Sequence, residues 1–303
     1  EIAPLSSMVF AEIVHEAGLP KGVFNLVNGD GPGVGTQLST HPDVDMISFT
    51  GSTRAGIAIT KAAADTLKKV ALELGGKGAN VVVADADDKA VVRGARHCFY
   101  NSGQSCNAPT RMLVERSVYD RAVETAAKVA EETQVATAHQ PGRHIGPVVS
   151  RQQWDRIQSL IQAGIDEGAR LVAGGPGLPE GVNRGYFVRP TVFADVSNDM
   201  TIAQQEIFGP VLSIIPFETE EEAIAIANDT PYGLTNYVQS QDGPRRNRVA
   251  RRLRSGMVEM NGASRGAGSA FGGVKMSGRA REGGVMGLEE FMDSKAISGW
   301  ATD

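Results

Sequence analysis

Short apolar runs alternate with amphipathic stretches along the chain, a pattern typical of strands that alternate with helices. The apolar runs predict strands over residues 23–27, 46–49, 68–72, 79–84, 110–114, 170–173, 187–193, 211–217, 236–238, 257–260 and 295–300. Helical spacing predicts helices over residues 4–17, 53–64, 85–100, 117–132, 150–168, 220–228, 243–254 and 288–292. Because strands and helices joined by short loops favour parallel βαβ units, the pattern predicts an α/β fold.

The pattern is interrupted most clearly at Leu74-Gly75-Gly76. One series of strands and helices ends there, and a second series begins with the apolar run 79–84. Residues 262–287 are rich in glycine, and we expect an irregular path for them. The first residue, Glu1, lies inside a helical pattern, and we therefore expect this sequence to be part of a longer protein.

Composition narrows the classes of protein that fit. Glycine provides 36 of the 303 residues, against a usual frequency of ~7%, which indicates tight turns or close backbone approaches. The formal net charge of −5 argues against a nucleic-acid or anionic-membrane surface. Two cysteines are too few for a disulfide scaffold and favour a reducing, cytoplasmic location. No apolar run reaches the ~18 residues of a membrane span, so we expect no membrane partner.

Cys106 is the first candidate for chemistry. It lies in a polar loop, residues 101–109, whereas Cys98 stands beside Phe99 in an apolar stretch. A thiolate in an accessible loop can act as a nucleophile, and adjacent backbone N–H groups can hold an oxyanion. The residues alone leave open that Cys106 is an inert loop cysteine.

Glu73 is the second candidate, because it ends the predicted strand 68–72 and is followed at once by Leu74 and two glycines. Sites of α/β proteins lie at the carboxyl ends of parallel strands. Apolar neighbours would raise the pKa of this carboxyl, which suits a general base. The alternative is a solvated glutamate at a strand end.

Two strand-to-helix junctions could bind phosphate through backbone N–H groups. One is the glycine-rich loop that contains Gly31 and Gly35, and the other is the turn with Gly51 and Ser52. The first does not follow the G-x-G-x-x-G spacing, and glycine-rich turns are also common without a ligand.

Glu206 and Phe208 precede a predicted strand, where an acid and an aromatic ring could grip a ribose and a flat ring. A turn with a phenylalanine anchored in the core is the alternative.

Six arginines within residues 245–254 fit a solvated helix face better than a nucleic-acid site, since no aromatic residue stands among them. The five histidines show no spacing typical of metal ligands, so we expect no metal.

Taken together, several segments resemble motifs of the aldehyde dehydrogenase superfamily. They follow one another in the same order as in that family and at about the same spacings. The matching segments are residues 49–52 (FTGS), 72–77 (LELGGK), 103–106 (GQSC), 206–211 (EIFGPV), 232–234 (YGL) and 271–278 (FGGVKMSG). The resemblance covers essentially the whole chain. It implies a partial Rossmann-like cofactor domain over residues 1–75, an α/β catalytic domain over 76–285 and a C-terminal helix and oligomerisation strand over 286–303.

The resemblance also implies an activity, the oxidation of an aldehyde to a carboxylic acid. Cys106 would attack the aldehyde to form a thiohemiacetal and then a thioester, which Glu73 would hydrolyse by activating water. The Cys106 N–H would supply one oxyanion donor. The residues implied to line the aldehyde tunnel are Tyr100, Ser105, Asn107 and Phe271.

The cofactor implied is NAD, with NADP also possible. Glu1 matches the family position whose carboxylate can hold the adenosine ribose, and Glu206 is the family's second ribose-binding acid, with Phe208 nearby. The remaining residues expected at the cofactor are Gly31, Gly35, Gly51, Ser52, Leu74 and Gly75. The resemblance further implies a homodimer or homotetramer.

The family's N-terminal part has no counterpart in this sequence. That part includes an asparagine of the oxyanion hole and a cofactor-binding lysine just before the position of Glu1. We therefore expect an active intact protein but a nearly inactive segment over residues 1–303. Two alternatives stay open, a cofactor-free thioesterase or acyltransferase that uses Cys106 and Glu73, and a fragment with no catalytic role.

Overall fold

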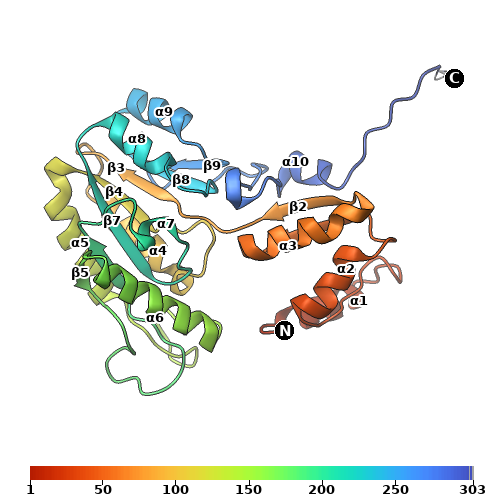
Figure 1. Ribbon diagram of the computed structural model, residues 1–303, viewed down its shortest axis with the longest axis horizontal. Helices are drawn as coiled ribbons and strands as arrows, with labels where there is room; N and C mark the ends of the chain where they lie inside the picture. Colours follow the sequence, from red (N-terminus) through yellow and green to blue (C-terminus); the bar gives the residue numbers. More distant parts are fainter. Residues whose placement is uncertain (300, 302–303) are drawn as a thin grey trace.

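The computed structural model describes residues 1–299 and 301 and contains a two-stranded and a seven-stranded sheet (Figure 1). In the smaller sheet, β1 (Met46–Thr50) and β2 (Lys69–Glu73) are parallel, and helix α3 (Thr53–Ala63) joins them. Helices α1 (Leu5–Glu16) and α2 (Thr36–Thr40) lie in the same part of the molecule, drawn in red and orange in Figure 1. The βαβ unit expected between residues 46 and 72 is therefore confirmed.

The larger sheet carries the core of the molecule. Its strand order is β5-β6-β7-β4-β3-β8-β9, and every neighbouring pair is parallel except β5 with β6. The strands are β3 (Ala79–Val82), β4 (Arg111–Glu115), β5 (Arg170–Ala173), β6 (Thr191–Ala194), β7 (Val211–Phe217), β8 (Thr235–Gln239) and β9 (Met257–Met260). The central strands are mainly apolar because helices cover both of their faces.

Alternate residues of each strand point to opposite faces of the larger sheet. Met112 and Val114 belong to the core under α4 (Ala90–Phe99) and α5 (Tyr119–Glu132). Leu113 belongs to the core on the other face. The helices packed on that second face are α6 (Arg151–Asp166), α8 (Glu220–Asn228) and α9 (Gly243–Arg252).

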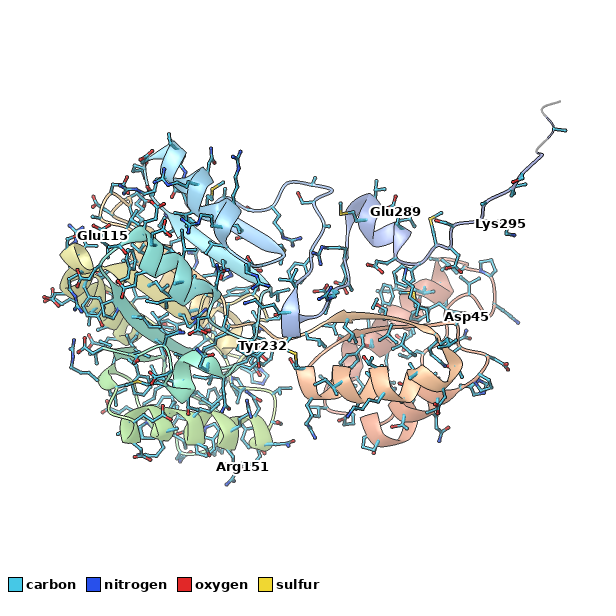
Figure 2. The ribbon with its side chains drawn as sticks, turned by 45° about the horizontal axis from the view of Figure 1, so that its top comes forward. Asp45, Glu115, Arg151, Tyr232, Glu289 and Lys295 are labelled. Atoms are coloured by element: carbon cyan, nitrogen blue, oxygen red, sulfur yellow. The ribbon has the colours of Figure 1, made fainter. Side chains whose placement is uncertain are left out.

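Two segments connect the sheets. The chain passes directly from β2 to β3 through residues 74–78, and residues 277–280 return to run beside β2. The Leu74 N–H donates to the Ser277 carbonyl at 2.9 Å, and the Ala280 N–H donates to the Leu72 carbonyl at 3.3 Å. Figure 2 shows Tyr232 at the junction between the two parts. These two connections place residues of the smaller sheet next to residues of the larger sheet.

Three expected elements differ from the structure. Residues 23–27 form no strand and are exposed, because no strand among the described residues lies beside them to pair with their backbone. The short helix expected over 288–292 begins and ends earlier, as α10 (Gly284–Glu289). The structure also contains a short helix that the pattern did not predict, α7 (Thr201–Gln204). Residues 295–299 of the last expected strand are unpaired, and residue 300 lies outside the described residues.

Across the described residues, every helix is too short or too polar to cross a lipid bilayer.

Candidate active site

A cavity of about 870 Å³ lies where the two sheets meet. Its walls come from the β1–α3 turn, the end of β2, the loop before β4, the start of α6 and the turn before β7. The residues expected at the site that line this cavity are Gly51, Ser52, Glu73, Leu74, Gly75, Ser105, Cys106, Asn107, Glu206, Phe208 and Phe271. Residues as far apart in the sequence as Ile2 and Phe271 therefore share one space.

Four expected site residues do not line the cavity. Gly31 and Gly35 belong to a helical turn that continues into α2, and the Gly35 N–H donates to the Asp30 carbonyl at 3.2 Å within that turn. Tyr100 is 71% exposed because the helix α4 ends there and turns the ring to solvent. Glu1 is exposed, while its neighbour Ile2 reaches the cavity wall.

The loop that presents Cys106 has an unusual backbone. Three consecutive residues, Asn101, Ser102 and Gly103, have φ values of 51°, 57° and 72°, in the left-handed region that non-glycine residues rarely adopt. The Ser102 hydroxyl donates to the Gly146 carbonyl at 2.7 Å, which holds this shape. A Cβ on Gly103 would lie 2.0 Å from the carbonyl carbon and oxygen of Gly209, so only glycine fits. Such strain is common at functional sites.

The Cys106 thiol is half-buried, and burial raises its pKa, with the charge of Glu206 as the next cause. The backbone N–H groups of Cys106 and Asn107 act in the opposite direction, because they can donate to a thiolate. The same N–H groups can donate to an oxyanion on a carbon attached to the sulfur. The resting group is therefore a thiol that needs a base, with oxyanion donors beside it.

Glu73 supplies a carboxyl at the end of β2. Its side chain is 3% exposed, and neither carboxyl oxygen has a hydrogen-bond partner among the described residues. Burial, assisted by the charge of Glu282 and opposed by Arg281, raises the pKa of Glu73 to about 8. A Cβ on Gly272 would come within 2.8 Å of the Glu73 carboxyl. Glu73 is therefore a buried acid that titrates near neutral pH, as a general base requires.

Glu206 lies on the other side of the cavity, against the segment that follows Glu73. Its Oε1 accepts a hydrogen bond of 2.9 Å from the Gly76 N–H, and a Cβ on Gly75 would collide with the carboxylate. Phe208 has a φ of 55°, and the Gln153 amide holds that turn by donating to the Ile207 and Phe208 carbonyls at 3.0 and 2.9 Å. The carboxylate is thus fixed in position.

The N-terminus of α3 opens on the same cavity. The Ser52 hydroxyl caps the helix by accepting from the Ala55 N–H at 3.2 Å, and the Gly51 N–H donates to the Glu73 carbonyl at 3.0 Å. Free N–H groups at a helix start, together with the helix dipole, favour an anionic group. This end of the cavity can therefore receive a phosphate.

Sequence reasoning missed several wall residues, among them Gln104, Val149, Gln153, Arg156 and Tyr232. Gln153 and Arg156 stand three apart on α6, and the Arg156 guanidinium donates to the Glu206 carbonyl at 3.1 Å. Their spacing indicates that they share one face of the helix. Nothing in the nearby sequence indicates that this face packs against the turn that carries Glu206.

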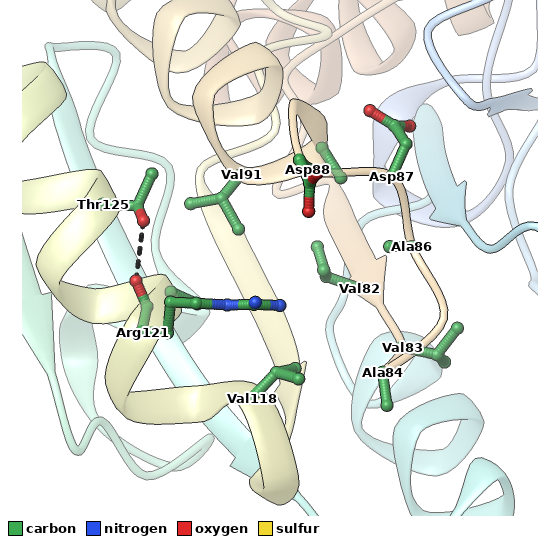
Figure 3. Close-up of a pocket in the computed structure, with 12 residues that line it drawn as sticks. Val82, Val83, Ala84, Ala86, Asp87, Asp88, Val91, Val118, Arg121 and Thr125 are labelled. Carbon is green, nitrogen blue, oxygen red and sulfur yellow. Dashed lines mark hydrogen bonds between the residues drawn. The ribbon is translucent and has the colours of Figure 1, made fainter.

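A smaller cavity, of about 210 Å³, lies between α4, α5 and the end of β3 (Figure 3). Arg121 extends across it toward the loop that carries Asp88. None of the expected site residues lines it. Among the described residues, no three His, Cys, Asp or Glu side chains cluster as metal ligands would.

A half-buried thiol, a buried carboxyl and a helix N-terminus thus share one cavity of an α/β protein. The model of the aldehyde dehydrogenase family matches residues 1–297. The chain belongs to the aldehyde dehydrogenase family, which confirms the resemblance seen in its motifs.

Individual relatives agree with this assignment. The 3-succinoylsemialdehyde-pyridine dehydrogenase of Pseudomonas sp. is 51% identical over 301 residues, which cover 99% of this chain and 63% of the relative. The crystal structure of an aldehyde dehydrogenase from Bartonella henselae is 67% identical, with a TM-score of 0.98, over 99% of this chain and 63% of that one.

A mutant of aldehyde dehydrogenase C from Pseudomonas syringae, crystallised with NAD⁺ and octanal, is 50% identical with a TM-score of 0.97. The match covers 99% of this chain and 62% of that one. The chain therefore spans less than two thirds of the length of these relatives.

Proposed function

We propose that the protein carrying this sequence oxidises an aldehyde to a carboxylic acid, with NAD as the hydride acceptor. The observation that carries the proposal is the position of Cys106 and Glu73 on one cavity, although they lie on different elements. Relatives named as aldehyde or semialdehyde dehydrogenases support the reaction class. Because the chain spans 63% of their length, the proposal concerns the intact protein.

The residues of the cavity suit a dinucleotide. Glu206, held by the Gly76 N–H, offers a carboxylate to ribose hydroxyls, and the capped N-terminus of α3 at Gly51 and Ser52 offers N–H groups to a pyrophosphate. Phe208 offers a flat apolar contact at the same wall. When bound, NAD supplies the acceptor for the hydride that leaves the aldehyde carbon. A solved relative holds NAD⁺ together with octanal, which supports this cofactor; NADP stays possible.

The side chains of the chain would perform the remaining steps. The Cys106 thiol releases its proton to solvent, and its sulfur forms a bond to the aldehyde carbon while the carbonyl electrons move to oxygen. The Cys106 N–H stabilises the resulting thiohemiacetal oxyanion. After oxidation the carbon is held as a thioester. Glu73 takes a proton from the water that attacks it; the C–S bond breaks, the carboxylic acid leaves and the Cys106 thiol regains a proton.

We further propose that residues 1–75 belong to the cofactor-binding part, 76–285 to the catalytic part and 286–303 to an oligomerisation segment. Large apolar side chains near the C-terminus support an assembly of two or four copies, since they are exposed in the single chain. These are Val285, Met286, Leu288, Phe291, Met292 and Ile297.

Mass spectrometry tests the covalent step in the intact protein. With an aldehyde and NAD and a rapid acid quench, we expect acyl mass on Cys106 and NADH in solution. Cys98 is the internal control, because it is fully buried and burial raises its pKa to about 12. Ester hydrolysis without any NAD reduction would favour the thioesterase instead. Full NAD-dependent turnover by residues 1–303 alone would contradict the expectation that the segment is nearly inactive.

A further inference from the structure

Arg281 places a cation close to the buried carboxyl of Glu73. A Cβ built on Gly272 would lie 2.8 Å from the Arg281 Nη1 and 2.8 Å from the Glu73 Oε1. These two atoms are therefore separated by no more than twice that distance. Neither carboxyl oxygen of Glu73 has a hydrogen-bond partner among the described residues, so the guanidinium does not bind the carboxyl directly. The two groups are near enough to interact through their charges without being in contact.

Backbone carbonyls hold the Arg281 guanidinium in place. Its Nη1 donates to the Gly273 carbonyl at 2.7 Å and to the Ala280 carbonyl at 2.8 Å. The nearby acid Glu290 accepts from the backbone N–H of Arg281 at 3.2 Å and forms its ion pair with Lys69, at 3.3 Å. Within the described part of the chain, no acidic side chain forms an ion pair with the Arg281 guanidinium. Its position is thus fixed, while its charge is left without a directly bound carboxylate.

The segment that carries Arg281 is tied to β2 beside Glu73. The N–H groups of Phe271 and Glu282 each donate to the carbonyl of the other at 2.7 Å, which closes the segment into a narrow loop. The Ala280 N–H donates to the Leu72 carbonyl at 3.3 Å and fixes this loop along the strand. Because Gly272 has no Cβ, the guanidinium and the Glu73 carboxyl can both occupy the space next to it.

The other groups around Glu73 disfavour its charged form. Burial raises the pKa of Glu73, and the negative charges of Glu282 and Glu290 add to this effect, whereas the positive charge of Arg281 opposes it. Cys106 lies on the same cavity, but its sulfur is acylated when the thioester is hydrolysed and then carries no charge. Among the described residues, Arg281 is therefore the cation that acts against the burial of this acid.

From this geometry we propose that Arg281 is a positioning residue for the reaction: its guanidinium, held beside Glu73, favours the ionised carboxylate that takes the proton from water. This role rests on Glu73 acting as the base, as proposed above. An opposite charge within ~4–6 Å of a carboxyl favours its charged form. Arg281 is half-buried, so solvent screens its charge only in part. Arg281 should therefore lower the pH at which hydrolysis of the acyl-enzyme reaches half of its maximum rate.

The pH profile of acyl-enzyme hydrolysis in the intact protein tests this role. 4-Nitrophenyl acetate transfers an acetyl group to Cys106, and peptide mass spectrometry follows the loss of that group from about pH 6 to pH 10. In Arg281→Gln the midpoint of the profile should move upward by about one pH unit, because the carboxylate loses its neighbouring cation. Hydrolysis well below the midpoint should then be about tenfold slower, while the maximum rate at high pH should change by less than about twofold.

Matched variants separate the charge of Arg281 from its packing. Arg281→Lys keeps a positive charge and should keep the midpoint close to that of the unmodified protein. Arg281→Met is a second neutral variant and should move the midpoint as Arg281→Gln does. Arg279→Gln removes a charge from an exposed position two residues earlier and should leave the midpoint unchanged. Circular dichroism shows whether each variant remains folded.

A lower maximum rate with an unchanged midpoint in Arg281→Gln and Arg281→Met would mean that Arg281 only holds the loop, and would overturn its role toward Glu73. An upward shift in Arg281→Lys as large as that in the neutral variants would overturn it as well, since the charge would not be responsible.

Glu73→Gln distinguishes this role from the proposed function. If Glu73→Gln keeps the rise of hydrolysis with pH, Glu73 is not the base, and both the proposed mechanism and the role of Arg281 fail. If the rise disappears in Glu73→Gln while Arg281→Gln keeps the original midpoint, Glu73 remains the base and only the role of Arg281 is rejected.

Discussion

The two parts of the molecule contribute to the same cavity, but they differ in how they are built. The larger sheet is enclosed by helices, with Met112, Leu113 and Val114 fully buried, and it carries the Cys106 loop. The two-stranded sheet carries Glu73 and the α3 N-terminus, and its neighbour α1 has no buried residue. Residues 74–78 and 277–280 join the parts. The proposed nucleophile, Cys106, thus rests on a packed core, while the proposed base, Glu73, depends on the junction.

The largest effect is expected at the thiol. Cys106→Ser should lower kcat/KM for aldehyde oxidation by the intact protein by a factor on the order of 10⁴ or more, since the attacking sulfur is lost. Steady-state NADH formation measures it. Cys98→Ser should retain most of the activity, because Cys98 only donates weakly to the Val211 carbonyl inside the core. Equal losses in both variants would show that packing, not chemistry, accounts for the effect.

The base at the junction should have the next largest effect. Glu73→Gln should slow hydrolysis of the acyl-enzyme by about 10²–10⁴-fold, the usual contribution of a positioned base. Burial raises the pKa of Glu73 to about 8, so only a fraction is ionised at lower pH. The hydrolysis rate should therefore rise about tenfold per pH unit below 8 and level off above it.

This pH dependence separates Glu73 from the thiol, because the preformed acyl-enzyme has no free sulfur to titrate. The rise with pH should disappear in Glu73→Gln. Glu12→Gln, on an exposed position of α1, is the matched control and should keep the rise. A flat profile in the unmodified protein would remove Glu73 from the role of base.

Stability should differ between the two parts of the chain. In residues 1–303, Leu113→Ala should lower the free energy of unfolding by about 2–5 kcal/mol, because it leaves a cavity in the core. Leu5→Ala should change it by less than about 0.5 kcal/mol, since Leu5 is 73% exposed on α1. Urea unfolding followed by circular dichroism measures both. Similar losses would show that α1 packs as tightly as the larger sheet.

The smallest effect concerns Lys77 at the junction, a fully buried amine with no hydrogen-bond partner among the described residues. Burial, with the nearby charge of Arg111, lowers its pKa to about 7, against 10.5 for a free lysine. Between pH 10.5 and 7 the unfolded chain binds a proton that the folded chain does not, so stability falls as pH falls. Below pH 7 the destabilisation by Lys77 has reached its full value.

Lys77→Met should therefore stabilise the chain by roughly 1–3 kcal/mol at pH 7, and the gain should shrink toward pH 10. Unfolding midpoints at the two pH values measure it. Lys61→Met, on the exposed face of α3, should show no such pH dependence. A gain that does not vary with pH would mean that shape, not charge, is responsible.

Local patterns predicted the elements well where the apolar period was regular, as in β4, β7 and α5. They failed at residues 23–27, because an apolar run becomes a strand only when another strand pairs with its backbone. The motifs also singled out Cys106, Glu73 and Glu206, whose residue types and flanking glycines are local features. They could not find Gln153 or Val149, since neither stands in a distinctive local context.

The amino-acid sequence by itself determined the α/β class, the family and the residues able to carry covalent chemistry, because periodicity and motifs are properties of neighbouring positions. Only the tertiary structure decided that Tyr100, Gly31 and Gly35 lie away from the cavity while Arg156 and Tyr232 line it. It alone gave the burial that raises the pKa of Glu73. Desolvation and contact depend on which distant segments pack together, and that depends on the whole chain at once.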